Sequence, residues 1–165
     1  MPDMRRFRIP LIFFIFIPCI SYASCTGFGC SCSVSTSAVN FGTYNPMSST
    51  NLTTSNTAAV SVACSVVVAG IISYVIALSP GNSGTFASSR YLNKGGVHMN
   101  YNLYTTSALT SIWGNGTSST ATVSDSYTIF GSTTRNYAAY GSIPALQRTV
   151  TVGTYTDSVT VTVTY

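Results

Sequence analysis

Three side chains supply most of the acid–base chemistry in the chain after residue 23: His98, Asp125 and Asp157. A histidine and a carboxylate could join one of the many serines in a nucleophilic site of the Ser–His–Asp type. Two carboxylates that met across a sugar could instead act as a glycosidase pair. The three residues are far apart in sequence, however, and His98 fits the polar face of a strand. We therefore expect a solvated histidine, no enzyme and no bound cofactor.

Cysteines are the other reactive groups, and their number indicates export. Cys19 lies in the apolar N-terminal segment, which leaves Cys25, Cys30, Cys32 and Cys64. An even number in an exported chain indicates disulfides, and four cysteines allow three pairings. A Cys32–Cys64 bond would join the first two predicted strands and stabilise the fold by about 3–4 kcal/mol, with Cys25 left to pair with Cys30. The pairing stays open at this point. Two separated Cys-x-x-Cys pairs are lacking, so no metal site is expected.

The first 23 residues have the organisation of a secretory signal. Three arginines precede a short apolar core at residues 9–20, and Ser21-Tyr22-Ala23 offers small residues where signal peptidase cuts. The apolar run is shorter than the roughly 20 residues of a membrane span, so no integral span is expected. An alternative is lipid attachment at Cys25, although Tyr22 stands where such sites favour an aliphatic residue. We expect a signal peptide at 1–23, a single domain at 24–165, and export through the periplasm to the cell surface.

The charge of the exported part excludes one class of partner. The whole chain has a net charge of +4, and the first 23 residues take with them three arginines and one aspartate. Four basic and two acidic residues remain, a net charge of +2 that is too weak and scattered to bind nucleic acid. Low charge with abundant Ser, Thr, Gly and Tyr suits an extracellular β-protein.

The elements that would position these residues are predicted to be strands. Residues 158–165 alternate valine with threonine, the clearest period of two in the chain. No residues follow this strand in the sequence, so we expect an edge that another chain could pair with. Ala69-Gly70 is predicted to turn a hairpin. Many short strands separated by turns predict an antiparallel sandwich. The predicted strands are 32–44, 58–68, 71–78, 97–104, 122–130, 136–143, 149–152 and 158–165.

The single tryptophan lies in a glycine-rich loop, Trp113-Gly114-Asn115-Gly116-Thr117. One interpretation is an exposed aromatic side chain that contacts a sugar or a surface. The other is a core residue that closes one end of the sandwich, with Asn-Gly forming the turn. The second interpretation is favoured.

The order and spacing of these segments resemble the spore coat protein U domain, the subunit family of archaic, Csu-type chaperone–usher pili. The tail, residues 140–145 and 153–165, carries the best match. The other matching segments are residues 32–35, 41–46, 60–64, 74–79, 100–104 and 113–117.

The resemblance implies an incomplete immunoglobulin-like sandwich that lacks its last strand. In such families a periplasmic chaperone lends a strand to the open groove, and another subunit replaces it at the outer-membrane usher. By position, the residues that would border the groove are Val159, Val161, Val163 and Tyr165 on one side, and Val34, Val39 and Phe41 on the other.

The function that the resemblance implies is that of a structural subunit of a secreted surface fibre or of a spore or cell coat. Its partners would be the chaperone, the usher and other pilus or coat subunits. Asn115 and Ser142 stand where the family more often has Asp and Arg. Residues 24–31 contain two glycines and two cysteines, which make a poor donor strand. We expect a subunit that accepts a strand and donates none, either at the distal tip, where it could serve adhesion or biofilm formation, or in a short coat assembly. The alternative is a lectin-like adhesin that binds a ligand through aromatic loops such as the one at Trp113.

Overall fold

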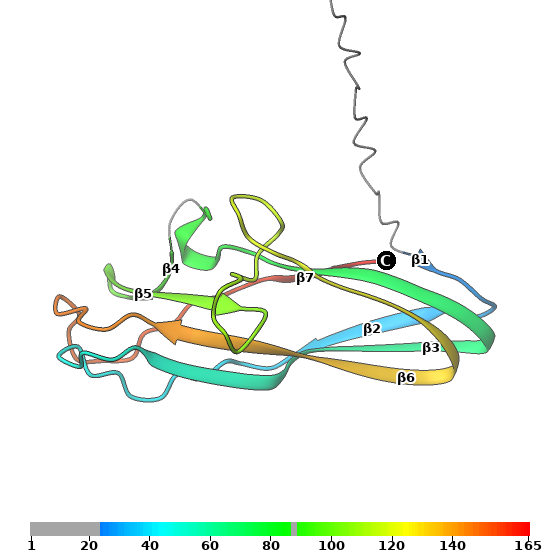
Figure 1. Cartoon of the computed structure of the whole chain (residues 1–165), viewed down its shortest axis with the longest axis horizontal. Coiled ribbons are helices and arrows are strands. Elements are labelled where there is room, and N and C mark those ends of the chain that lie inside the picture. The colour runs from blue at the N-terminus through cyan, green and yellow to red at the C-terminus, as the bar shows by residue number, and fades with distance from the viewer. Residues whose placement is uncertain (1–23, 87–88) are drawn as a thin grey trace, which may run out of the picture.

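The computed structural model describes residues 24–86 and 89–165, and the regular structure there is almost entirely β-strand (Figure 1). The predicted signal peptide, residues 1–23, lies outside the described residues. All strand pairs are antiparallel. One short 3-10 turn, η1, spans Gly81–Ser83. The strands are β1 (Ser24–Cys25), β2 (Ser31–Thr36), β3 (Leu52–Leu78), β4 (Arg90–Lys94), β5 (Val97–Tyr104), β6 (Val123–Ile143) and β7 (Val161–Thr164).

Two long strands form the frame of the fold. β3 has 27 residues and β6 has 21, and they pair with each other along most of their length. Their register shifts between Ser65 and Ala69, where both strands turn together at one end of the molecule (Figure 1). Such an irregularity bends a β-ribbon without ending it. The predicted hairpin at Ala69-Gly70 is therefore wrong: Gly70 remains in β3, opposite Ile129, because its partner strand continues across the bend.

The bend folds the ribbon into two layers. The first half of β3 pairs with β2, and the second half pairs with β1 and β7. β5 pairs with the end of β6, and β4 pairs with β5. Figure 1 shows the two halves of the ribbon lying one over the other, joined at the bend. The predicted all-β antiparallel sandwich is confirmed.

The core lies between the two layers. Alternate residues of β3 are buried on both sides of the bend, as the period of two requires. Trp113 is also fully buried, and its indole N–H donates a hydrogen bond to the carbonyl oxygen of Ile76 at 3.2 Å. The interpretation of Trp113 as a surface-contact residue is wrong. A tryptophan with its N–H paired inside the core gains from the burial of a large apolar surface.

The predicted strand boundaries differ from the observed ones in several places. The strands predicted at 122–130 and 136–143 are one strand, β6; β3 begins at Leu52, before the predicted residue 58; and β7 covers only residues 161–164 of the predicted 158–165. The first strand ends at Thr36 instead of residue 44, and residues 149–152 form no strand. β4 was not predicted, because its sequence Arg-Tyr-Leu-Asn-Lys has no alternation of apolar and polar residues. The strand predicted at 97–104 coincides with β5.

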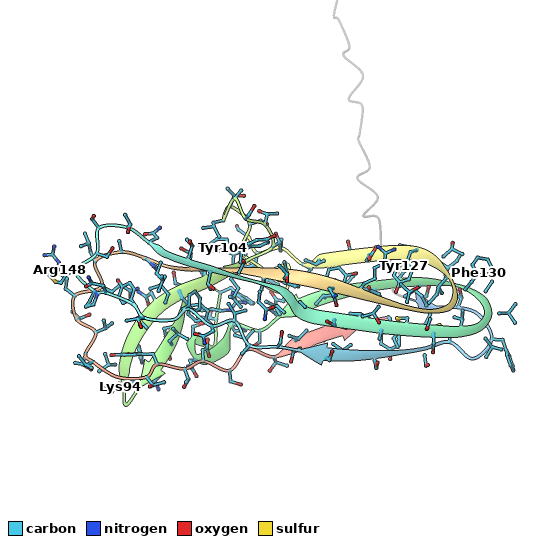
Figure 2. The ribbon with its side chains drawn as sticks, turned by 90° about the horizontal axis from the view of Figure 1, so that it is seen from below. Lys94, Tyr104, Tyr127, Phe130 and Arg148 are labelled. Carbon is cyan, nitrogen blue, oxygen red and sulfur yellow. A yellow bond between two sulfur atoms is a disulfide. The ribbon has the colours of Figure 1, made fainter. Side chains whose placement is uncertain are left out.

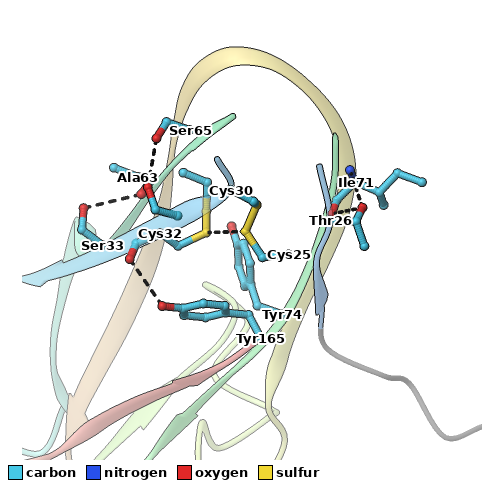
Figure 3. The surroundings of a disulfide bond; sticks show 12 residues. Cys25, Thr26, Cys30, Cys32, Ser33, Ala63, Ser65, Ile71, Tyr74 and Tyr165 are labelled. Atoms are coloured by element: carbon cyan, nitrogen blue, oxygen red, sulfur yellow. Dashed lines mark hydrogen bonds between the residues drawn. A yellow bond between two sulfur atoms is a disulfide. The ribbon is translucent and has the colours of Figure 1, made fainter. Parts of the chain in front are cut away.

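Two disulfides fix the N-terminal part of the chain to the sandwich (Figure 3). Cys32 of β2 lies directly opposite Cys64 of β3 and is bonded to it, with the two Cα atoms 4.1 Å apart. Cys25 is bonded to Cys30 and closes the loop between β1 and β2. Of the three pairings that four cysteines allow, the structure has the one in which Cys32 joins Cys64 and Cys25 joins Cys30.

Candidate strand-binding groove

One wall of the candidate site is β7 and the residues just before it. β7 pairs with the end of β3, and the pairing extends beyond both strands to Ser79 and Thr160. The N–H of Ser79 donates to the carbonyl oxygen of Thr160 at 2.9 Å, and the N–H of Thr160 donates to Ser79 Oγ at 2.9 Å. Backbone groups of an antiparallel strand point alternately to either side. Val159 and Val161 therefore direct their N–H and C=O groups away from β3, toward an edge that has no strand partner among the described residues.

The opposite wall is the chain that follows β2. After Ser37 this segment leaves the ladder with β3, and side chains hold it in place. Asn56 Nδ2 donates to Ser37 Oγ and to the carbonyl oxygen of Ala38, both at 2.9 Å. Thr54 Oγ1 donates to the carbonyl oxygen of Asn40 at 2.9 Å. The segment is thus held close to the sheet without being a strand of it.

Two adjoining cavities, of about 370 and 750 Å³, lie between these walls. We call them together the groove. The smaller cavity has an apolar floor and lies beside residues 158–161; the larger lies beside residues 150–157. The floor of the smaller cavity includes Val60, Leu78, Leu103 and Trp113, and that of the larger includes Met99 and Ile143. The residues that line both are Ala38, Val39, Phe41, Leu92 and Asp157.

A carboxylate lies at the junction of the two cavities. Asp157 Oδ1 accepts hydrogen bonds from the backbone N–H groups of Asn82 and Ser158, both at 2.7 Å. Its Oδ2 accepts a hydrogen bond from the hydroxyl of Tyr101 at 2.7 Å. Burial raises the pKa of Tyr101, and the bond to Asp157 and its negative charge raise it further. Gly81 borders this carboxylate, and a Cβ atom there would overlap Asp157 Oδ2.

The buried guanidinium of Arg90 stabilises the backbone next to Asp157. Arg90 is 1% exposed, and its guanidinium donates to the carbonyl oxygen of Ser79 and to that of Trp113. Burial lowers the pKa of Arg90, and the negative charge of Asp157 partly offsets that effect. Arg90 thereby links Trp113 in the core to Ser79, the residue that is hydrogen-bonded to Thr160 just before β7.

The structure brings together four of the seven residues predicted to border the groove: Val39, Phe41, Val159 and Val161. The other three lie outside both cavities: Val34, Val163 and Tyr165. Tyr165 instead approaches β2, where its hydroxyl donates to the carbonyl oxygen of Cys32 at 3.4 Å (Figure 3).

Sequence reasoning missed the polar residues of the groove. Asp157 was considered only as a possible catalytic carboxylate, and neither Tyr101 nor Arg90 was singled out. Arg90 is the first residue of a strand without alternation, and nothing in the sequence indicates that its charge is buried. The one available signal for Tyr101 is its place on the apolar face of residues 97–104.

The three residues that were weighed for acid–base chemistry have different partners in the structure, and Asp157 has been described above. The imidazole of His98 stacks on the ring of Tyr91, with centroids 3.8 Å apart. Asp125 Oδ2 accepts a hydrogen bond from the hydroxyl of Tyr137 at 2.6 Å and lies 3.9 Å from Arg135 Nη1. Within residues 24–86 and 89–165 no group of three or more His, Cys, Asp or Glu side chains is placed to hold a metal. Over the same residues, no helix has the length and apolar character to cross a bilayer.

Apolar side chains gather on the surface at the bend of the ribbon, which we call the apolar end. It comprises Phe28, Val67, Val68, Ile71 and Phe130, each more than half exposed. Three segments meet there: the loop between β1 and β2, the bulge of β3 and the turn of β6. Figure 2 shows Phe130 at one end of the molecule and Lys94 and Arg148 at the other. Lys94 and Arg148 thus lie at the end of the molecule opposite the apolar end.

Comparison with known proteins agrees with this architecture. Residues 27–162 match the model of the Spore Coat Protein U domain family, which confirms the resemblance found in the sequence. The fold is similar to a chain in the crystal structure of the CsuC-CsuE chaperone-tip adhesion subunit pre-assembly complex, from archaic chaperone-usher Csu pili of Acinetobacter baumannii. The identity is 22% and the TM-score 0.52. The similarity covers 82% of this chain and 40% of that chain, so this chain spans less than half the length of the solved one. No curated protein matches. The fold is that of an incomplete immunoglobulin-like sandwich.

Proposed function

Since the chain belongs to the Spore Coat Protein U domain family, we propose that it is a structural subunit of a surface fibre or coat. In this role the groove is filled by a strand of another protein. Export through the periplasm and assembly by a chaperone and an usher belong to the same proposal. No enzymatic step is part of it.

The observation that carries the proposal is the groove itself. Its two walls are backbone segments, and its floor is part of the hydrophobic core. An added strand could bond to the outward backbone groups of Val159 and Val161 while its alternate side chains enter the two cavities. Main-chain bonds would supply affinity, and the cavities would select side chains.

The conformation of residues 24–31 supports the view that the domain accepts a strand in its groove, while residues 24–31 donate none. Ser24 and Cys25 pair with β3 of the same chain, and the disulfide from Cys25 to Cys30 folds the loop back. The loop also docks on the bend, where the N–H of Val67 donates to the carbonyl oxygen of Phe28 at 2.9 Å. A segment engaged in this way is not free to extend into a neighbouring subunit.

The test is to express the full chain in a bacterial periplasm with and without a chaperone of the chaperone–usher class. Peptides of alternating apolar residues are then added to the purified chain, and the melting temperature is followed. We expect higher soluble yield with the chaperone and a rise in melting temperature with peptide. A monomer that is stable alone and indifferent to both additions would contradict the proposal.

Neighbouring residues of β7 offer a matched control for this test. Val161 lines the groove, whereas Thr162 is exposed on the outer face of the same strand. Val161→Lys should abolish stabilisation by peptide, and Thr162→Lys should retain it. If Val161→Lys does not accumulate, Val39→Lys tests the opposite wall in the same way.

A second candidate function is adhesion, and the apolar end favours it. A contiguous exposed apolar surface of this kind marks a contact site. The solved complex that the fold resembles contains a tip adhesion subunit by its description, and a strand-accepting subunit could occupy a tip. The double variant Phe28→Ser/Phe130→Ser should lose adsorption to hydrophobic beads and keep its response to peptide. The exposed pair Met47→Ser/Val152→Ser, away from the bend, serves as control. Equal adsorption of both double variants and the unmodified chain would contradict this candidate.

A further inference from the structure

On the basis of the proposed function, we propose that Asp157 makes the groove select a hydroxyl-bearing residue in its partner strand. The strand that fills the groove would carry a serine or threonine at the junction of the two cavities, between apolar residues that enter the cavities themselves. Asp157 is thus a specificity-determining residue, and its partner is an apolar strand with one embedded hydroxyl.

The position of Asp157 is the first step of the argument. It is one of the residues that line both cavities, so a strand that spans the groove must pass it. It is also the one charged residue among all those that line the two cavities. A strand that matched only the apolar floor would place an apolar side chain against this carboxylate.

The hydrogen bonds of Asp157 are the second step. A carboxylate has about four acceptor sites, two on each oxygen. Oδ1 accepts two N–H groups, from Asn82 and Ser158, whereas Oδ2 accepts only the hydroxyl of Tyr101. One acceptor site on Oδ2 therefore remains, and water can fill it while the groove is open. Asp157 is half-buried before any strand is added.

The cost of filling the groove is the third step. A partner strand would remove water from the carboxylate, and an apolar side chain would give no bond in return. A hydroxyl would replace the lost water with a charge-assisted hydrogen bond. A cation is less suitable, because the guanidinium of Arg90 is buried nearby and already interacts with Asp157. A second positive charge would be repelled by Arg90, so a neutral donor fits best.

The experiment uses strand peptides that differ only in the position of one hydroxyl. The parent peptide places valine at every residue that faces the groove, and each derivative replaces one valine with the nearly isosteric threonine. Binding constants are measured with the full chain purified from its chaperone complex, for the unmodified chain and for Asp157→Asn. The threonine position that gives the tightest binding then identifies the peptide residue that lies opposite Asp157, so the register of the peptide in the groove need not be known beforehand.

We expect one threonine position at which the peptide binds about tenfold more tightly than its all-valine parent, the range of a hydrogen bond to a charged group. At the other positions threonine should weaken binding, because the cavities are apolar. In Asp157→Asn the preference should fall to about threefold or less. If the Asn variant does not fold, Tyr101→Phe tests the same point: it frees a second acceptor site on Oδ2, so the preference for threonine should grow.

The outcomes separate this inference from the proposed function. If the all-valine peptide binds most tightly at every position, the selection of a hydroxyl is wrong and strand addition stands. A threonine preference that is unchanged in both Asp157→Asn and Tyr101→Phe also overturns the role of Asp157. If no peptide binds at all, the proposed function fails and the inference fails with it.

Discussion

The buried guanidinium of Arg90 donates two hydrogen bonds to the carbonyl oxygen of Ser79, from Nε at 3.0 Å and from Nη2 at 2.8 Å. In a regular ladder the N–H of Thr160 would donate to this carbonyl, but here it donates to Ser79 Oγ. Arg90 thus replaces a backbone bond with its own, and the Ser79 hydroxyl restores the bond to Thr160. The start of β7, and with it one wall of the groove, depends on a side chain in β4.

Arg90→Ala should be strongly destabilising. It would leave the carbonyl oxygens of Ser79 and Trp113 without their donor inside the core, and it would open a cavity. We expect a loss of about 3 kcal/mol or more in the free energy of unfolding, measured by guanidinium denaturation. The matched control is Arg135→Ala, which removes a side chain 46% exposed with one ion pair of 3.9 Å and a cation–π contact with the ring of Tyr127. That change should cost about 1 kcal/mol or less. Similar losses for both variants would contradict the anchoring role of Arg90.

The two disulfides should contribute unequally to stability. Cys32–Cys64 spans 32 positions of sequence and Cys25–Cys30 spans 5. In the loop-entropy model, removal of the long-range bond costs about 3–4 kcal/mol and removal of the short-range bond about 2 kcal/mol. The double variants Cys32→Ala/Cys64→Ala and Cys25→Ala/Cys30→Ala, compared by denaturant unfolding, check this order. The reverse order would show that docking of the N-terminal loop matters more than chain entropy.

Stability should fall in alkaline solution because buried tyrosines must ionise. Burial raises the pKa of Tyr74 to about 12 and also raises the pKa of Tyr137, whose hydroxyl donates to Asp125. An unfolded tyrosine has a pKa of about 10, so the folded state favours the neutral form. The stabilisation is complete below pH about 10 and is lost as the pH rises toward 12. Urea unfolding from pH 8 to 11.5 should show this decline, and it should be shallower in Tyr74→Phe.

The control for the alkaline series is Tyr91→Phe, which changes a ring stacked on His98 outside this cluster. It shows how much of the change in slope any tyrosine substitution produces. An equal effect of Tyr74→Phe and Tyr91→Phe would contradict a specific contribution from the buried cluster.

Gly141→Ala should narrow the groove. A Cβ atom at Gly141 would lie 2.6 Å from two carbon atoms of the Phe41 ring, closer than side chains tolerate. Phe41 is only half-buried, so its ring can move into the groove at a modest cost in stability. We expect peptide binding to weaken by about tenfold or more, while the free energy of unfolding without peptide falls by about 1 kcal/mol. The double variant Gly141→Ala/Phe41→Leu should recover part of the binding. If Gly141→Ala binds peptide normally, Phe41 does not shape the groove.

Several elements of the fold follow from local patterns in the sequence. Residues 97–104 alternate apolar and polar side chains, and the observed strand coincides with them. The valine–threonine tail likewise contains β7, with valines toward the core and threonines exposed. Where the pattern was interrupted, prediction failed: Ala69-Gly70 resembles a turn but remains in strand β3. The pairing of Gly70 with Ile129 in β6 decides that outcome, and no local sequence reveals it.

By itself the sequence determined the strand content, the family and the apolar valines of the last strand, because these depend on residue types repeated at short range. Only the tertiary structure decided that Val39 and Phe41 meet Val159 and Val161 across two cavities, and that Trp113 is buried. The tertiary structure also decided that Asp157 lines both cavities and that Arg90 is buried close to it. These relationships join residues that belong to different segments of the chain, and the two walls of the groove are far apart in sequence. They arise from the bending of one long ribbon, a property of paired strands that no single segment encodes.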